Sequence, residues 1–343
     1  MYLHSEIFEQ PAVLQGMYRA NREIVQKMTK EIGAVPSVVV AARGTSDNAA
    51  RYAKYVWGAF SHLSVTLATP SLFSLYKKPP KMQGSLVMGI SQSGQPPDIL
   101  NVIREGNAQG CPTLAITNHP DSPLGEEADF VIDIQAGVEK AVAATKTYTA
   151  QLQAIAMLSA AWARDEERWD QIAQLPEWCI KALDEQDSIA QSALRYRYMD
   201  QCVILGRGFN YATAFEWSLK LKELTYVLAE PYSSADFQHG PIAMVANGFP
   251  VFAVAPHGAV FNDVLELLCR LKDQHLAELF IISDREEALE LATTPVAIPG
   301  QIPEWLTPIV SILPAQLFCY HLTKVKNYDP DKPRGLQKVT LTY

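Results

Sequence analysis

Four residues that can exchange protons lie close together in one stretch of this chain: Lys220, Glu223, Glu230 and His239. A spacing of three positions puts Lys220 and Glu223 on one face of a helix, where the lysine can hold the carboxylate in its proton-accepting form. A histidine in a loop can exchange a proton near neutral pH. The residue types also fit a surface ion pair, which Glu216 would make equally well with Lys220. The stretch therefore predicts an acid–base site if its helix faces a ligand.

A strand and a glycine turn precede this helix, and the same succession occurs earlier in the chain. The later copy begins with VILGRG at Val203, and the earlier copy reads SVVVAARGTSDNAARYAKYVWGAF, from Ser37 to Phe60. Residues 42–45 align with residues 206–209, so the chain consists of two related halves. A glycine turn that opens a helix can seat an anion on free backbone N–H groups.

Both halves continue with apolar segments that alternate with helical ones. The apolar segments lie within residues 85–94, 112–120, 130–134, 249–258 and 277–284, and long helices are expected from Thr145 and over 309–326. Strands as continuously apolar as these are typical of parallel sheets that helices cover on both faces. The pattern predicts an α/β protein with two tandem doubly wound parallel sheets, each a flavodoxin-like three-layer αβα domain. Ligands are expected at the carboxyl ends of the strands.

Length and composition agree with two domains. The chain has 343 residues, of which 48% are hydrophobic and 19% charged, and this suffices for two buried cores. We expect an N-terminal helical segment over 1–34, a first domain over 35–170, a second domain over 190–330 and a C-terminal tail over 331–343.

Charge and cysteine usage exclude several classes of protein. A net charge of −8 without a block of Lys or Arg argues against nucleic acid as a partner. We see no apolar run of about 18 residues for a membrane span, and residues 1–9 lack a signal-peptide core, so a cytoplasmic protein is expected. The five cysteines are scattered without CxxC spacing, which suggests neither disulfides nor a zinc site. We expect no metal and no organic cofactor.

Three hydroxyl-rich turns in the first half can together hold a phosphate monoester. They follow two strands and precede one long helix, and none contains the GxxxxGK[ST] motif of a nucleotide triphosphatase. The alternative is that Ser91, Ser93 and Thr145 are merely helix N-caps. The expected phosphate- and substrate-binding residues are Gly44, Thr45, Ser46, Ser91, Gln92, Ser93, Ala143, Ala144 and Thr145.

Five motifs in order carry a family resemblance. They are ARGTS at 42–46, ISQSG at 90–94, VAATK at 142–146, the segment from Lys220 to Pro241, and PRGLQK at 333–338. Together they resemble the double sugar isomerase (SIS) domain family over nearly the whole chain, from about Ser37 onward. Within that family the chain is most similar to SIS-type glucosamine-6-phosphate deaminases and to the isomerase half of glutamine-fructose-6-phosphate aminotransferase.

Three departures favour the deaminase branch. The chain reaches its first sugar domain after one helix, so we expect no glutaminase domain and no use of glutamine as the ammonia source. It has QPPD at 95–98 and AATK at 143–146, where the synthase resembles ETAD and ASTK, and its tail reads KVTLT from Lys338. Pro96 removes one hydroxyl that could have bound phosphate.

The resemblance implies a role for each acid–base residue. Glu223 is the base that moves a proton between C1 and C2, and Lys220 holds it ionised or lies beside the substrate carbonyl. His239 opens the sugar ring and reaches the active site of the neighbouring subunit, which implies a homodimer. The tail folds over the sugar and brings Lys338 to the open-chain substrate. Glu230, expected at the end of the helix before Pro231, binds substrate or only nearby backbone.

The sequence thus predicts an enzyme that converts glucosamine 6-phosphate to fructose 6-phosphate and ammonia. One alternative is a fructosamine-6-phosphate deglycase or another ketose/aldose phosphate isomerase. Another is a sugar-phosphate sensor without catalysis, against which the intact Lys220, Glu223, His239 and Lys338 argue.

Overall fold

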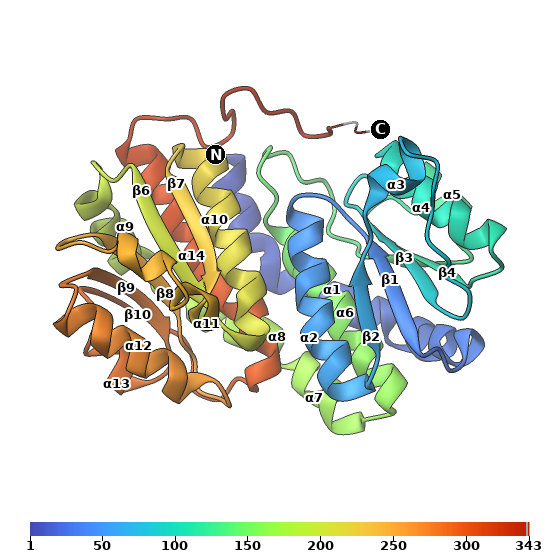
Figure 1. Cartoon of the computed structure of the whole chain (residues 1–343), viewed down its shortest axis with the longest axis horizontal. Coiled ribbons are helices and arrows are strands. Elements are labelled where there is room, and N and C mark those ends of the chain that lie inside the picture. Colours follow the sequence, from blue (N-terminus) through green and yellow to red (C-terminus); the bar gives the residue numbers. More distant parts are fainter. Residues whose placement is uncertain (341, 343) are drawn as a thin grey trace. The chain divides into compact units, whose positions relative to one another are not determined.

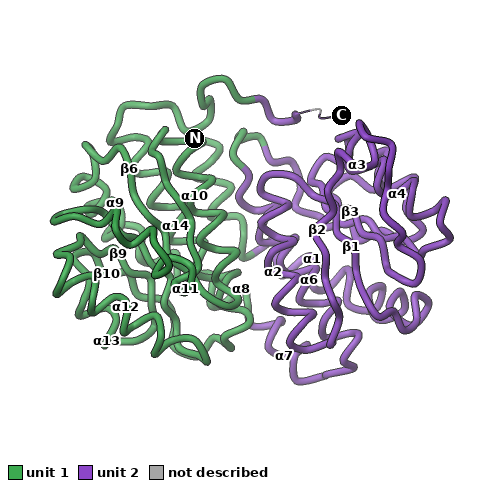
Figure 2. Tube along the Cα trace, viewed as in Figure 1, with its two compact units in different colours: residues 1–11, 140–143, 175–336 green, residues 12–139, 144–174, 337–343 purple. Residues whose placement is uncertain are grey.

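The chain forms two compact units in the computed structural model, which describes residues 1–340 and 342 (Figure 2). Unit 1 comprises Met1–Pro11, Lys140–Ala143 and Leu175–Leu336, and unit 2 comprises Ala12–Glu139, Ala144–Gln174 and Gln337–Tyr343. Helix α1 (Tyr2–Ile32) contributes its first residues to unit 1 and the rest to unit 2. Residues 341 and 343 of the expected tail lie outside the described residues.

Unit 2 contains the first half of the chain and is built on a parallel sheet with the order β2-β1-β3-β4-β5 (Figure 1). Its strands are β1 (Ser37–Ala41), β2 (Ser64–Leu67), β3 (Leu86–Ile90), β4 (Thr113–Thr117) and β5 (Phe130–Asp133). Its helices are α2 (Thr45–Ser61), α3 (Pro70–Ser74), α4 (Pro97–Ala108), α5 (Pro123–Glu127), α6 (Lys146–Ala163) and α7 (Glu166–Ala173). Strands β3 and β4 are buried along their whole length, as expected for a sheet that is covered on both faces.

Unit 1 contains the second half and repeats this design, with the parallel order β10-β9-β8-β6-β7. Its strands are β6 (Gln201–Gly206), β7 (Leu228–Ser233), β8 (Pro250–Val254), β9 (Glu278–Ser283) and β10 (Thr294–Ala297). Its α-helices are α8 (Leu175–Leu183), α9 (Gln186–Ala193), α10 (Tyr211–Thr225), α11 (Ser234–Phe237), α12 (Phe261–Asp273), α13 (Glu286–Leu289) and α14 (Thr307–Val325). Short 3₁₀ turns are η1 (Leu194–Tyr196), η2 (Gly208–Asn210), η3 (Pro241–Met244) and η4 (Glu304–Leu306).

The two sheets share one topology, so a ligand is expected at the equivalent position in each sheet. In unit 2 the chain leaves β1 outward to β2 and then returns to the other side of β1 as β3, so the direction of winding reverses between β1 and β3. In unit 1 it reverses in the same way between β6 and β8. Ligands of open parallel sheets bind beyond the carboxyl ends of the strands at such a reversal. The predicted α/β fold with two parallel sheets is confirmed.

Edge strands are where the sequence prediction was incomplete. Strand β7 lies at the edge of its sheet, and it contains Glu230 and Pro231, which we had placed at the end of a helix. Helix α10 instead ends at Thr225, followed by Tyr226 in a left-handed conformation. An edge strand tolerates proline because one side of the strand needs no backbone donor. The segment before His239, expected as a loop, is the end of β7 and the short helix α11.

One helix passes the length and composition test for a membrane span, contrary to the expectation that no such run exists. The segment Glu304–Val325 is long and apolar enough to cross a membrane, but 94% of its apolar stretch is buried inside the protein. It contains α14, which packs on α8, α9 and α10. Phe318 of α14 contacts Phe280 with ring centroids 4.8 Å apart, and Trp217 and Phe252 join the same aromatic cluster. The helix is therefore part of the core of unit 1.

Candidate active site

The turn after β3 in unit 2 is tightly folded and presents free backbone donors. Ser91 Oγ accepts a 3.1 Å hydrogen bond from the Gly94 N–H, which folds the turn back on itself. Gly94 has a φ of 63°, and a Cβ there would lie 1.9 Å from Ser122 Oγ, so only glycine fits. Among residues 1–340 and 342, the backbone N–H groups of Gln92 and Ser93 have no hydrogen-bond partner. Two free donors in a tight turn suit a phosphate.

Neither serine of this turn caps the following helix. The N-cap of α4 is Pro96, which has no side-chain cap, and Ser93 Oγ accepts only a long 3.4 Å bond from the Gln95 N–H. The alternative that Ser91 and Ser93 are ordinary N-caps therefore does not describe this turn.

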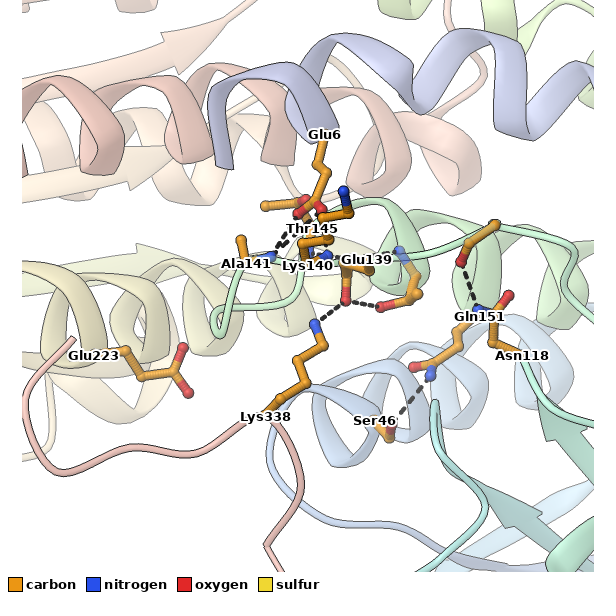
Figure 3. A network of polar contacts seen from close by, with 12 residues as sticks. Glu6, Ser46, Asn118, Glu139, Lys140, Ala141, Thr145, Gln151, Glu223 and Lys338 are labelled. Atoms are coloured by element: carbon orange, nitrogen blue, oxygen red, sulfur yellow. Dashed lines mark hydrogen bonds and ion pairs between the residues drawn. The ribbon is translucent and has the colours of Figure 1, made fainter. Parts of the chain in front are cut away.

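The turn after β1 faces the same carboxyl edge of the sheet. Gly44 is the N-cap of α2, with a φ of 53° and no side-chain cap. Ser46 is buried, and its Oγ accepts a 3.1 Å bond from Gln151 Nε2 of α6 (Figure 3). Arg43 makes a 2.7 Å ion pair with the fully buried Asp98 at the start of α4. This ion pair joins the turn after β1 to the helix that follows β3.

A buried carboxylate that we did not predict organises the third turn. Glu139 accepts hydrogen bonds from the N–H groups of Thr145 (2.9 Å) and Thr147 (3.1 Å) and from Thr147 Oγ1 (2.9 Å), so it caps α6. The hydroxyl of Thr145 is buried and has no hydrogen-bond partner within the described part of the chain. The N–H groups of Ala143 and Ala144 are likewise unpaired there. These free donors, and not the Thr145 N–H, are available to a ligand.

The C-terminal tail docks onto unit 2 at two points. Lys338 Nζ lies 2.6 Å from Glu139 Oε2, and the side chain of Glu139 is fully buried (Figure 3). The carbonyl oxygen of Thr342 accepts a 3.2 Å bond from the Asp98 N–H at the start of α4. Both contacts lie where the strands of the sheet end, so the tail crosses the carboxyl edge that carries the three turns.

In unit 1 the acid–base residues of α10 form a buried cluster. Lys220 Nζ lies 2.5 Å from Glu223 Oε2 and 3.4 Å from Glu216 Oε1. Lys220 and Glu216 are 1% and 0% exposed, whereas Glu223 keeps 23% of its side chain exposed. Burial favours the neutral amine, but the two carboxylates outweigh it and raise the pKa of Lys220. The lysine is therefore a permanent cation, and Glu223 is the member of the cluster that solvent or substrate reaches.

The other two predicted residues of this segment, Glu230 and His239, make their hydrogen bonds and ion pairs with other partners. Glu230 is 56% exposed and pairs with Lys222 at 3.3 Å. His239 lies in an exposed turn after α11, and its backbone N–H donates to the Asp236 carbonyl. Its imidazole has no partner among the described residues.

The two units offer different chemistry. Unit 2 presents unpaired backbone donors and hydroxyls, which can bind a phosphate, and unit 1 presents a carboxylate paired with a buried cation, which can accept and return a proton. Among the residues that the structure describes, no group of three or more His, Cys, Asp or Glu could hold a metal ion.

Comparison with known proteins identifies the family. The SIS domain model matches residues 32–161 and 197–326. The glutamine–fructose-6-phosphate aminotransferase of Thermococcus kodakarensis is 33% identical over 98% of this chain, and that of Thermotoga maritima is 31% identical over 98%. The chain spans 57% and 58% of the length of these two relatives.

Solved structures agree with this assignment. The C-terminal domain of glucosamine-fructose-6-phosphate aminotransferase from Francisella tularensis superposes with a TM-score of 0.87 at 28% identity, covering 97% of this chain and 98% of that one. Glucosamine-6-phosphate deaminase from Thermotoga maritima gives a TM-score of 0.81 at 21% identity, covers all of both chains and shows the same fold. The chain therefore belongs to the SIS domain family and carries two SIS domains in tandem.

Proposed function

We propose that this chain is a phosphosugar isomerase that deaminates glucosamine 6-phosphate to fructose 6-phosphate and ammonia. The observation that carries the proposal is the cluster of Glu216, Lys220 and Glu223. Burying a lysine and two carboxylates carries a desolvation penalty, so such a cluster points to a functional role. One of the two carboxylates here, Glu223, stays accessible. An accessible carboxylate beside a fixed cation is a suitable base for removing a proton next to a carbonyl.

Phosphate recognition is proposed for the turns after β1 and β3 and for the turn before α6, in which Ala143 is assigned to unit 1 and Ala144 and Thr145 to unit 2. The free N–H groups of Gln92, Ser93, Ala143 and Ala144 and the unpaired hydroxyl of Thr145 support this role, because they are donors that no described residue satisfies. Gly44, Thr45, Ser46 and Ser91 are proposed to complete the site. Binding energy from a phosphate holds the sugar while the chemistry takes place at its other end.

The proposed reaction is an internal redox rearrangement followed by hydrolysis. With the ring open, Glu223 removes the proton from C2 and returns it to C1, so the aldehyde carbon is reduced and C2 becomes an imine. Water adds to the imine, and ammonia leaves as the C2 ketone forms. We propose that Lys338 approaches the open-chain substrate from the tail, and that its contact with Glu139 holds the tail ready.

His239 is proposed to open the sugar ring in the partner subunit of a homodimer. An exposed imidazole without a partner among the described residues supports a role outside its own chain. Glu230 is proposed only as a peripheral substrate contact, since it is exposed and pairs with Lys222.

The choice of deamination rests on two sequence variants. The chain has Gln95-Pro96-Pro97 and Ala143-Ala144 at positions where the aminotransferase resembles ETA and AS. The relatives named aminotransferases are much longer than this chain, so their glutamine-dependent activity is not transferred to it.

The decisive experiment measures both products with the purified chain and glucosamine 6-phosphate. Ammonia and fructose 6-phosphate are quantified by coupled enzyme assays in the wild type and in Glu223→Gln. The substitution keeps the shape of the side chain but cannot accept a proton, so kcat should fall by about 10² to 10⁴ and exchange of the C2 hydrogen with deuterated solvent should stop. Glu266→Gln on α12 is a matched control, because Glu266 is exposed and belongs to neither proposed site, and it should retain wild-type activity.

Other outcomes would distinguish the alternatives. Equal amounts of ammonia and fructose 6-phosphate support deamination. Interconversion of glucose 6-phosphate and fructose 6-phosphate without ammonia would reduce the function to isomerisation, and binding without turnover would make the chain a sensor. Deuterium exchange that persists in Glu223→Gln would move the base to another residue, with Glu230 the next to test.

A further inference from the structure

The C-terminal tail is held to unit 1 by successive hydrogen bonds, of which the last is at Arg334. Asp331 Oδ1 accepts a 2.8 Å bond from the Leu3 N–H at the start of α1. The Arg334 N–H donates to the hydroxyl of Tyr226 at 2.8 Å. Residues 335–337 make no hydrogen bond with any described residue. Arg334 is therefore the point from which the end of the tail extends.

The side chain of Arg334 stacks on the same tyrosine. Its guanidinium carbon lies 3.8 Å from the centroid of the Tyr226 ring and 6.0 Å from that of Tyr328. The two rings meet edge to face with their centroids 4.9 Å apart. A planar guanidinium over an aromatic face is an attractive contact to which arginine is well suited. Tyr226 thus holds Arg334 twice, through its hydroxyl and through its ring.

This contact lies next to the acid–base cluster along the chain. Tyr226 is the C-cap of α10 and follows Glu223 by three residues. Directly after Arg334 the tail turns at Gly335, whose φ of 67° favours glycine. Lys338 follows Arg334 by four residues, so their Cα atoms are at most about 14 Å apart. A fixed point at the end of α10 therefore limits where the Lys338 amine can lie.

We propose that Arg334 and Tyr226 form a clamp that positions Lys338. Both are positioning residues, which act through the Lys338 amine and touch no reacting atom. The clamp shortens the unanchored part of the tail, so that Lys338 stays docked on Glu139. Its effect on catalysis rests on the proposed function, whereas its effect on the docking of Lys338 does not.

Tether length gives the size of the effect. With the clamp, four residues separate Lys338 from the preceding anchor, and without it the preceding hydrogen-bonded anchor is Asp331, seven residues away. The effective concentration of a tethered group falls as about the −3/2 power of tether length or more steeply. Loss of the clamp should therefore lower the effective concentration of the Lys338 amine at Glu139 by at least about two-fold.

Acetylation of Lys338 measures its docking without reference to activity. The folded full-length chain is treated with limiting N-hydroxysuccinimidyl acetate, and the rate at Lys338 is compared with that at Lys54, which is exposed on α2, by mass spectrometry of their peptides. An amine docked 2.6 Å from a buried carboxylate is protected. Arg334→Gln and Tyr226→Leu should raise the ratio at least about two-fold. Tyr226→Phe, which keeps the ring and loses only the hydroxyl, should raise it less.

Arg197→Gln is the matched control for these variants. Arg197 is also exposed in unit 1, and its guanidinium carbon lies 5.7 Å from the centroid of the Tyr198 ring. It lies between η1 and β6, outside the tail, so its removal should leave the acetylation ratio unchanged.

The kinetic test asks whether Arg334 acts through Lys338. Arg334→Gln should lower kcat for glucosamine 6-phosphate at least about two-fold with little change in KM, because the proposed phosphate donors are untouched. In a Lys338→Ala background the same substitution should have no further effect, since no amine is left to position. A role in stability alone would lower activity in both backgrounds.

Two results would overturn the clamp. One is an unchanged acetylation ratio in Arg334→Gln and Tyr226→Leu at wild-type melting temperature. The other is an equal loss of kcat with Lys338 present or replaced. If Tyr226→Leu does not fold, Arg334→Gln decides alone, because Arg334 is exposed. A raised acetylation ratio, beside a Lys338→Ala chain with wild-type kcat, would refute the proposed catalytic role of Lys338 and leave the clamp supported.

Discussion

Replacement of Lys220 by methionine tests whether the cluster on α10 is a buried electrostatic unit. Methionine keeps most of the side-chain volume but leaves Glu216 and Glu223 facing each other without a cation. Removing one partner of a buried ion pair costs about 3 to 5 kcal/mol, because the remaining charge stays desolvated. Lys220 is 1% exposed and Glu216 0%, so screening by solvent does not reduce this cost.

A double-mutant cycle isolates the interaction. Glu216→Gln alone leaves Lys220 paired with Glu223 at 2.5 Å and should cost only about 1 to 2 kcal/mol. In Glu216→Gln/Lys220→Met the unpaired buried carboxylate is gone, so the double variant should be less destabilised than the sum of the single variants, by about 1 to 3 kcal/mol. Lys222→Met on the same helix is the control, because Lys222 and Glu230 are 40% and 56% exposed and their pair should contribute at most about 1 kcal/mol.

The assay is urea unfolding followed by tryptophan fluorescence, with kcat measured in parallel. Since the pKa of Lys220 is raised in the fold above its ordinary 10.5, its stabilising effect is complete at neutral pH and is lost only as pH rises above that value. The difference between wild type and Lys220→Met should thus be constant between about pH 6 and 9. If Lys220→Met lowered the free energy of unfolding by less than about 1 kcal/mol, Lys220 would not be a strongly coupled buried charge. Strict additivity of the two single effects in the double variant would contradict the interaction between Glu216 and Lys220.

Three further predictions concern phosphate, pH and assembly. Ser91→Ala and Ser93→Ala should each raise KM by removing about 1.5 to 3 kcal/mol of hydrogen bonding to a charged group, and an unchanged KM in the double variant would contradict a phosphate turn. Burial lowers the pKa of His321 to about 4, so the unfolded chain binds a proton that the folded chain does not, and stability should fall as pH drops from about 6.5 to 4. His321→Gln should flatten this dependence of Tm on pH, and parallel curves would exclude His321 as its source. If His239 serves the partner's site, mixing inactive His239→Ala and Glu223→Gln chains should restore about a quarter of wild-type activity, and no recovery after verified subunit exchange would rule this out.

The interior of each sheet could be predicted from sequence because its signal is strong. Strands such as β3 and β8 lie between two neighbours and under helices on both faces, so nearly every residue is apolar. The edge strands gave no such signal. Strand β2 alternates between exposed and half-buried residues, and β7 contains a glutamate and a proline, which are unusual in a central strand.

The candidate site was predictable only where its residues are close in sequence. The spacing of Lys220 and Glu223 indicated one helix face, but not that this face is buried, because the residues that cover it come from other elements. We did not predict a role for Glu139, because its partner Lys338 lies 199 positions further along the chain. The N-cap residue of α6 makes no side-chain hydrogen bond to the helix. An acidic residue a few positions before such a helix could therefore have indicated a capping carboxylate.

Chemistry is divided between the two halves although their backbones repeat. The interval that relates Gly44 to Gly208 also relates Tyr52 and Val56 of α2 to Glu216 and Lys220 of α10. Tyr52 and Val56 are fully buried, so α2 meets the interior with apolar groups where α10 carries charges. Conversely, the turn with two serines in unit 2 has Ala255 and His257 at the corresponding positions of unit 1. Because buried charges and unpaired donors both cost stability, a second copy of either would destabilise the fold without adding a reaction. The repeat supplies two similar backbones, and in our proposal their side chains divide the work, with anion recognition in one unit and proton transfer in the other.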